Sequence, residues 1–90
     1  MHTEIRYSKK AKKFMDAQNQ QTQQRIRNGI KGLTMNPPVG DIKAMRGYAD
    51  RRFRLRIGKY RIIYRYTAEG QVDILYIMDI DSRGDIYKHI

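Results

Sequence analysis

Apolar and charged residues alternate in two short segments of the chain, which are separated by Gly58-Lys59. The first segment is Phe53-Arg54-Leu55-Arg56-Ile57, and the second, residues 60–66, reads Tyr-Arg-Ile-Ile-Tyr-Arg-Tyr. Alternation with a period of two is typical of a β-strand with one buried face, and a Gly-containing pair between two such strands is typical of a tight turn. The pattern therefore predicts a β-hairpin in which Ile57 lies opposite Tyr60.

This register gives the hairpin two different faces. The apolar face, which we expect in the core, carries Phe53, Leu55, Ile57, Tyr60, Ile62, Tyr64 and Tyr66. On the other face Arg56 lies opposite Arg61, Arg52 opposite Arg65, and Arg54 opposite Ile63. Like charges that face each other destabilise a sheet, so two such pairs indicate that this face binds a polyanion. The alternative is a solvated strand surface on which arginine stems cover apolar neighbours.

The residues before the hairpin predict one strand and two helices. Residues 3–7 alternate as a short strand, and Ser8 is a candidate N-cap for a helix over residues 9–17. Residues 18–24 are a polar link whose second half opens another helix, because Ile26, Ile30 and Leu33 recur at helical spacing. We expect Asn36-Pro37-Pro38 to stop that helix, since a residue before proline disfavours helical geometry.

The remaining segments complete a single domain over residues 1–90. Residues 39–50 read as a loop with a short strand around residues 42–45, and residues 72–80 are apolar enough for a central strand. The order is strand, helix, helix, then three strands in a meander. We therefore predict an α+β fold in which two N-terminal helices pack on one face of a small antiparallel sheet, leaving the arginines on an open, shallow, basic concavity.

The charge of the chain narrows the choice of partners. It has 19 Lys and Arg against 9 Asp and Glu, a formal net charge of +10, which favours nucleic acid, an anionic membrane surface or an acidic protein. With no cysteine and two histidines near opposite ends, the sequence offers no thiolate or histidine metal site, and we expect no cofactor. No apolar run reaches membrane-spanning length and the N-terminal residues lack a signal-peptide core, so we expect a cytoplasmic protein without a membrane partner.

The chain combines a helix pair, an Asn-Pro stop, a loop containing Gly47, the segment Arg54-Leu55-Arg56-Ile57-Gly58-Lys59-Tyr60-Arg61-Ile62-Ile63-Tyr64 and a closing Asp85-Ile86-Tyr87. In this combination it resembles the RelE/ParE superfamily of toxins. The resemblance spans almost the whole chain and implies a microbial-RNase-like RelE fold. For the RelE branch it implies cleavage of mRNA in the ribosomal A site, restrained by a cognate antitoxin. ParE-like members share the fold but poison DNA gyrase and need no RNase site.

The resemblance favours the RelE branch because Arg61, Arg83 and Tyr87 match RelE-like basic and aromatic positions. Cleavage of RNA by its own 2′-hydroxyl needs positive charge at the phosphate, a base and an acid, but neither a metal nor a small-molecule cofactor. Arg61 is the first candidate to clamp the phosphate, with Arg56 and Arg54 beside it. We expect Arg83 near the leaving oxygen and Tyr87 to stack on a base or to share in proton transfer.

The identity of the general base stays open at this point, because arginine is always protonated. The candidates are Asp81, Tyr87 and His89, and Asp81 stands where the RelE branch has an arginine. Asp81 could equally form an ion pair that orients Arg83. Tyr87 could equally pack against the domain and fix the end of the chain. We expect RNA contacts from Arg52, Arg65, Lys9, Lys10 and Lys13. The alternative for the lysines is a solvent-exposed helix face without a binding role. A gyrase-binding toxin and a non-catalytic nucleic-acid-binding module are the alternative functions.

Overall fold

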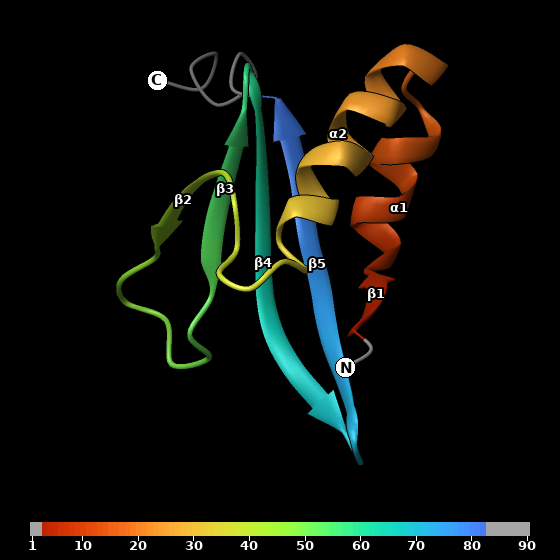
Figure 1. Cartoon of the computed structure of the whole chain (residues 1–90). Helices are drawn as coiled ribbons and strands as arrows, with labels where there is room; N and C mark the ends of the chain where they lie inside the picture. Colours follow the sequence, from red (N-terminus) through yellow and green to blue (C-terminus); the bar gives the residue numbers. More distant parts are fainter. Residues whose placement is uncertain (1–2, 83–90) are drawn as a thin grey trace.

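The computed structural model describes residues 3–82, which form a five-stranded sheet and two helices (Figure 1). In chain order the elements are β1 (Thr3–Tyr7), α1 (Lys9–Asp16), α2 (Gln20–Gly32), β2 (Asp41–Ala44), β3 (Phe53–Ile57), β4 (Tyr60–Glu69) and β5 (Val72–Ser82). The strands lie in the order β1-β5-β4-β3-β2. The predicted α+β architecture is confirmed, with both helices on one face of the sheet.

The sheet is mixed rather than wholly antiparallel. Strand β1 runs parallel to β5, whereas β2, β3, β4 and β5 pair antiparallel in sequence. Parallel pairing needs a long connection, and here both helices and three further strands lie between β1 and β5. The short strand expected around residues 42–45 is confirmed as β2, one residue earlier than predicted.

The predicted hairpin register is confirmed. Ile57 pairs with Tyr60 and Arg56 with Arg61, and the turn residue Gly58 has φ of 57°, in the left-handed region that favours glycine. The predicted pairing of Arg52 with Arg65 is not part of this ladder, because β3 begins only at Phe53.

Both helices begin at capping side chains. The Ser8 hydroxyl accepts the backbone N–H of Ala11 at 3.0 Å, and the Asn19 side chain accepts that of Thr22 at 2.8 Å. The cap at Asn19 starts α2 at Gln20, so the helix expected to open in the second half of residues 18–24 is confirmed, with a slightly earlier start. Helix α2 also ends at Gly32, before the proline pair that we expected to stop it.

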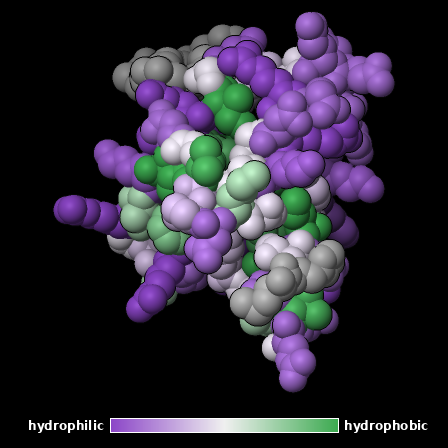
Figure 2. Space-filling view, viewed as in Figure 1, coloured by the Kyte–Doolittle hydropathy of each residue, from purple (hydrophilic) through white to green (hydrophobic). Residues whose placement is uncertain are grey.

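The core lies between the helices and the sheet. Its buried residues include Ala11, Met15, Ile26, Ile30 and Leu33 from the helical half, and Leu55, Tyr60, Ile62, Tyr64, Leu75, Ile77 and Ile80 from the strands. The helices do not cover the whole sheet, and Figure 2 shows apolar side chains visible between α2 and strands β2–β3. The prediction that Tyr66 lies in the core is wrong: its side chain is 43% exposed, and its hydroxyl donates to the Leu33 carbonyl at 2.8 Å.

The opposite side of the sheet, which carries Arg54, Arg56, Arg61 and Arg65, is here called the arginine face. A β-bulge interrupts the β4–β5 ladder on this part of the sheet: Ile63 pairs with Asp79 and Tyr64 with Ile77, so Met78 has no partner on β4. The carbonyl of Met78 instead accepts the Ser8 hydroxyl at 2.7 Å. The bulge thereby ties the start of α1 to β5.

Candidate nucleic-acid interface on the arginine face

Four residues from four strands form one row across the arginine face. Asp41 on β2 pairs with Arg56 on β3, Arg56 pairs with Arg61 on β4, and Arg61 pairs with Asp81 on β5. Directly paired residues project from the same side of a sheet. The row therefore reads Asp-Arg-Arg-Asp, and Asp41 at one end forms an ion pair with Arg56, which offsets part of the repulsion between the two central arginines.

Asp41 binds two of the arginines predicted to be catalytic. Its Oδ2 accepts Arg56 Nε at 2.9 Å, and its Oδ1 lies 3.7 Å from a terminal nitrogen of Arg54. The expected basic concavity is therefore not made of arginines alone, because carboxylates are interleaved with them. The hairpin pattern defined only β3 and β4, and Asp41 reaches them from a strand that precedes the hairpin.

Arg52 and Arg65 converge on another carboxylate. Arg52 donates to both oxygens of Asp50, at 2.9 and 2.7 Å, and Arg65 lies 3.8 Å from Oδ2. The hydrogen bonds from Arg52 lower the pKa of the Asp50 carboxyl from its usual value, against the opposing effect of partial burial. Two residues predicted to contact RNA are thus close together, although they do not pair in the ladder.

A hollow of about 320 Å³ lies on the arginine face beside the β-bulge. Three cationic side chains, one carboxylate and several apolar or aromatic side chains line it: Lys10, Arg52, Arg61, Asp79, Met45, Tyr48, Ile63 and Met78. Lys10 reaches this surface from α1 and forms an ion pair with Asp79 at 3.3 Å. The hollow therefore places positive charge next to an apolar wall.

Arg61 differs from its neighbours in how its charge is satisfied. Its Nε is buried without a hydrogen-bond partner, and within residues 3–82 no carboxylate lies within 4.0 Å of its guanidinium. Nε of Arg54 and of Arg65 is also buried and unpaired, but a terminal nitrogen of each contacts an aspartate. A partly buried guanidinium without a counter-charge is costly, so Arg61 is the member of the cluster best prepared to receive an anion.

The other predicted site residues fall outside this hollow or outside the described residues. Lys9 and Lys13 are exposed on α1 and do not line it. Asp81 pairs with Arg61 in the ladder, and its carboxylate accepts the backbone N–H of Ser82 at 2.8 Å. Arg83, Tyr87 and His89 lie beyond residue 82, outside the part of the chain that the structure describes.

Sequence reasoning missed Tyr48 and Asp79 at the hollow. The Tyr48 side chain is 48% exposed, and the guanidinium carbon of Arg52 lies 4.0 Å from the centre of its ring. The only signal in the sequence was a tyrosine beside Gly47 in the loop before the arginine-rich hairpin. Asp79 could not be assigned to this face, because a bulge changes which residues of a strand project together.

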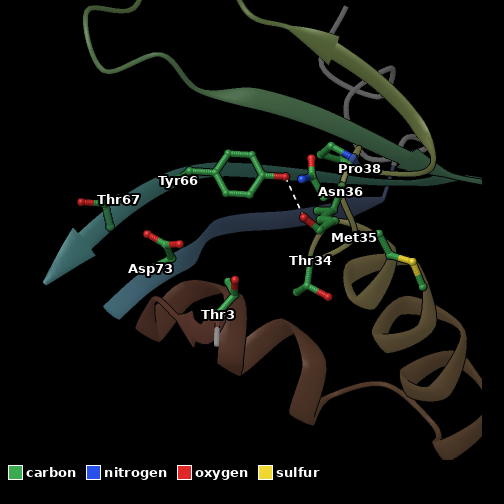
Figure 3. A pocket seen from close by; sticks show the side chains of 9 residues that line it. Thr3, Thr34, Met35, Asn36, Pro38, Tyr66, Thr67 and Asp73 are labelled. Carbon is green, nitrogen blue, oxygen red and sulfur yellow. Dashed lines mark hydrogen bonds between the residues drawn. The ribbon is translucent and has the colours of Figure 1, made fainter. Parts of the chain in front are cut away.

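A second hollow, of about 620 Å³, lies where the end of α2 approaches β4 and β5 (Figure 3). Its described lining includes Thr34, Met35, Asn36 and Pro38 on one side and Thr3, Tyr66, Thr67 and Asp73 on the strands. Those lining residues include a carboxylate and no cation. This larger hollow is therefore poorly suited to a phosphate, and the smaller one on the arginine face is the candidate site.

Across residues 3–82, no group of three His, Asp or Glu side chains is placed to hold a metal ion. Neither described helix is long and apolar enough to cross a membrane.

Comparisons with known proteins identify the family. Residues 5–87 match the model of the ParE toxin of the type II toxin–antitoxin system parDE, whereas no curated protein matches significantly. The fold is similar to the crystal structure of the archaeal RelE–RelB complex from Pyrococcus horikoshii OT3, with a TM-score of 0.67 and 21% identity over 93% of this chain and 98% of the other. It is also similar to the RelB–RelE antitoxin–toxin complex from Methanococcus jannaschii, with a TM-score of 0.64 and 23% identity over 94% and 98% of the two chains. Because the family model covers nearly the whole sequence, this chain belongs to the ParE toxin family of type II toxin–antitoxin systems, within the RelE/ParE superfamily.

Proposed function

We propose that this toxin is an endoribonuclease that cleaves mRNA in the ribosomal A site, using the 2′-hydroxyl of the RNA as the nucleophile. The observation that carries the proposal is the state of Arg61, which lines a nucleotide-sized hollow with Lys10 and Arg52 and has no carboxylate partner among the described residues. A guanidinium in this position matches the two oxygens of a phosphate.

The chemistry requires little beyond charge and orientation. When the 2′-oxygen attacks the adjacent phosphate, negative charge grows on the non-bridging oxygens, and Arg61 is positioned to stabilise it. Lys10 adds to this charge when it exchanges Asp79 for the phosphate. The bond to the 5′-oxygen then breaks, giving a 2′,3′-cyclic phosphate and a 5′-hydroxyl. Because the substrate supplies the nucleophile, no metal-bound water is needed.

Arg54 and Arg56 have a supporting part in this scheme. Their contacts with Asp41 place them beside Arg61, where they add to the positive potential but must exchange a carboxylate for a phosphate to bind RNA directly. Of the three candidates for the general base, Asp81 lies within the described residues, and it pairs with Arg61 in the ladder. We propose Asp81 for this role, with Arg83 and Tyr87 assisting at the leaving group as their match to the RelE branch implies.

We further propose a cognate antitoxin as the partner that restrains the toxin in the cytoplasm, where the ribosomes are. Two structures with a similar fold are complexes of RelE with RelB. The net charge of +10 favours an acidic or amphipathic segment of such a partner, so its association is expected to slow as salt rises.

A second candidate function is inhibition of DNA gyrase by binding, which the match to the ParE family model favours. The two functions differ in what they require of the arginine face. A toxin that acts by binding gyrase does not need an unpaired arginine in a hollow. A nuclease that stabilises the phosphate with Arg61 becomes inactive when that arginine is removed.

One experiment separates the candidates. Purified wild-type protein and Arg61→Ala are each added to ribosomes programmed with a defined mRNA and, separately, to gyrase supercoiling reactions. The proposal predicts cleavage by the wild type alone and normal supercoiling with both proteins. Intact mRNA together with blocked supercoiling would replace the nuclease by the gyrase inhibitor.

A further inference from the structure

We infer that the hollow on the arginine face is a subsite for one unstacked nucleobase of single-stranded RNA, with Tyr48 as the stacking platform. The inference rests on the proposed function, because it concerns the RNA that Arg61 would bind. It adds the residue that holds a base beside the phosphate.

Tyr48 is presented as a stacking group rather than a packing group. Its side chain is 48% exposed in the loop after β2, whereas the aromatic rings of Tyr60 and Tyr64 are in the core. One flat group already lies against it, since the Arg52 guanidinium is 4.0 Å from the ring centre. Bases of single strands stack on tyrosine rings and arginine planes of this kind.

The Arg52 guanidinium that lies against the Tyr48 ring is itself held by ion pairs. Arg52 donates two hydrogen bonds to Asp50, and Asp50 also lies 3.8 Å from Arg65 on β4. A loop side chain is thereby connected to a guanidinium anchored on the sheet, so less freedom is lost when a base binds.

The composition of the hollow fits a nucleotide. Met45, Met78 and Ile63 give an apolar lining beside Tyr48, and Arg61 and Lys10 supply the charge for a phosphate. Its volume of about 320 Å³ is at the small end of the ~300–1,000 Å³ typical of ligand pockets, which suits one unit of a polymer.

A purely structural role for Tyr48 makes a different prediction. If the ring only covers Arg52, any side chain of similar bulk should serve, and removing a base from the RNA should have no effect that depends on residue 48. If the ring stacks on a base, residue 48 must have a flat aromatic side chain. The effect of replacing Tyr48 and the effect of removing the base are then coupled.

The test uses the full-length protein and a fluorescent 12-nucleotide RNA, 2′-O-methylated throughout to prevent cleavage. Affinity is measured by anisotropy at one fixed salt concentration for the wild type, Tyr48→Phe, Tyr48→Leu and Arg61→Ala. The same RNA with a single abasic position, moved along the strand, completes a double-mutant cycle between ring and base. Melting temperatures show whether each variant is folded.

We expect Tyr48→Phe to bind like the wild type and Tyr48→Leu to bind about tenfold more weakly, as stacking on an aromatic ring predicts. One abasic position should weaken wild-type binding to the same degree and have little further effect on Tyr48→Leu. If folded Tyr48→Leu binds as tightly as the wild type, or if no abasic position couples to residue 48, the stacking subsite is wrong. Weak binding by Arg61→Ala in that case would leave the proposed nuclease standing, whereas a wild type that neither binds this RNA nor cleaves mRNA on programmed ribosomes would overturn both.

Discussion

Arg56 and Arg61 lie directly opposite each other on β3 and β4, but they are neutralised to different degrees. Arg56 Nε donates to Asp41 at 2.9 Å, whereas Arg61 has no ion-pair partner among residues 3–82 and faces a hollow. Like charges at this separation repel, and the ion pair between Arg56 and Asp41 offsets part of that repulsion. The arrangement leaves Arg61 as the cation free to bind phosphate.

Arg61→Ala should abolish function without unfolding the protein. Removing one donor that stabilises transition-state charge typically lowers the rate about 10²- to 10³-fold, and mRNA cleavage on programmed ribosomes should fall by at least the lower figure. Because the change also removes a like-charge contact, the free energy of unfolding should stay within about 0.5 kcal/mol of the wild type. The matched control is Arg27→Ala, an exposed arginine on α2, which should cleave normally. Full toxicity of folded Arg61→Ala would exclude the proposed role.

Asp41→Asn should increase RNA affinity. The carboxylate holds both Arg54 and Arg56, and neutralising it frees them for phosphates. Exposed ion pairs are worth roughly 0.2–1 kcal/mol, so binding should tighten by about two- to fivefold at low salt, with a steeper salt dependence. Asp73→Asn makes the same charge change at an exposed position away from the arginine face. Equal gains from both variants would show that net charge alone is responsible.

Asp50→Asn should remove an acid-sensitive part of the stability. The Arg52 hydrogen bonds lower the pKa of Asp50, so the native state favours the charged carboxylate. This contribution is complete above the ordinary aspartate pKa and is lost as the pH falls through the lowered value. Asp50→Asn should therefore melt at a lower temperature than the wild type at pH 7, and the difference should shrink towards pH 2. A difference that is the same across this range would contradict the assigned ion pair.

Ser8→Ala should affect both stability and activity. The hydroxyl caps α1 at Ala11 and donates to Met78, which lines the hollow, so its loss should cost about 1–2 kcal/mol and loosen the site. Asn19→Ala removes the comparable cap of α2, with no contact to the hollow. Thermal melts should show both losses, but ribosome-dependent cleavage should fall only in Ser8→Ala. Equal activity of the two folded variants would show that the α1 cap does not support the site.

The sequence could predict the hairpin because its signals are local. Alternation and Gly58 define the register from Ile57 to Tyr60, and Ser8 defines the start of α1 through its own hydrogen bond. The start of α2 could be predicted only approximately, because it depends on the Asn19 cap within a segment of uniform polar composition.

Local sequence patterns could not predict the carboxylates that neutralise the arginines of the site. Asp41 reaches the arginines from β2, Asp50 from a loop, and Asp79 through a bulge, and each contact depends on how distant segments pair. A charge alternation in one hairpin therefore predicts where the arginines project, but not how many of them are neutralised. The lack of a neutralising carboxylate among the described residues is what distinguishes Arg61 from the other arginines of the cluster.

The most direct test of the central claim replaces the ribose 2′-hydroxyl at the scissile nucleotide with 2′-O-methyl in an mRNA on programmed ribosomes. The account predicts that wild-type protein binds this complex but does not cut it, whereas unmodified mRNA gives a 5′-hydroxyl and a 2′,3′-cyclic or 3′-phosphate. Cutting of the 2′-O-methyl mRNA at that nucleotide, or an uncut unmodified mRNA together with arrested gyrase supercoiling, would contradict it.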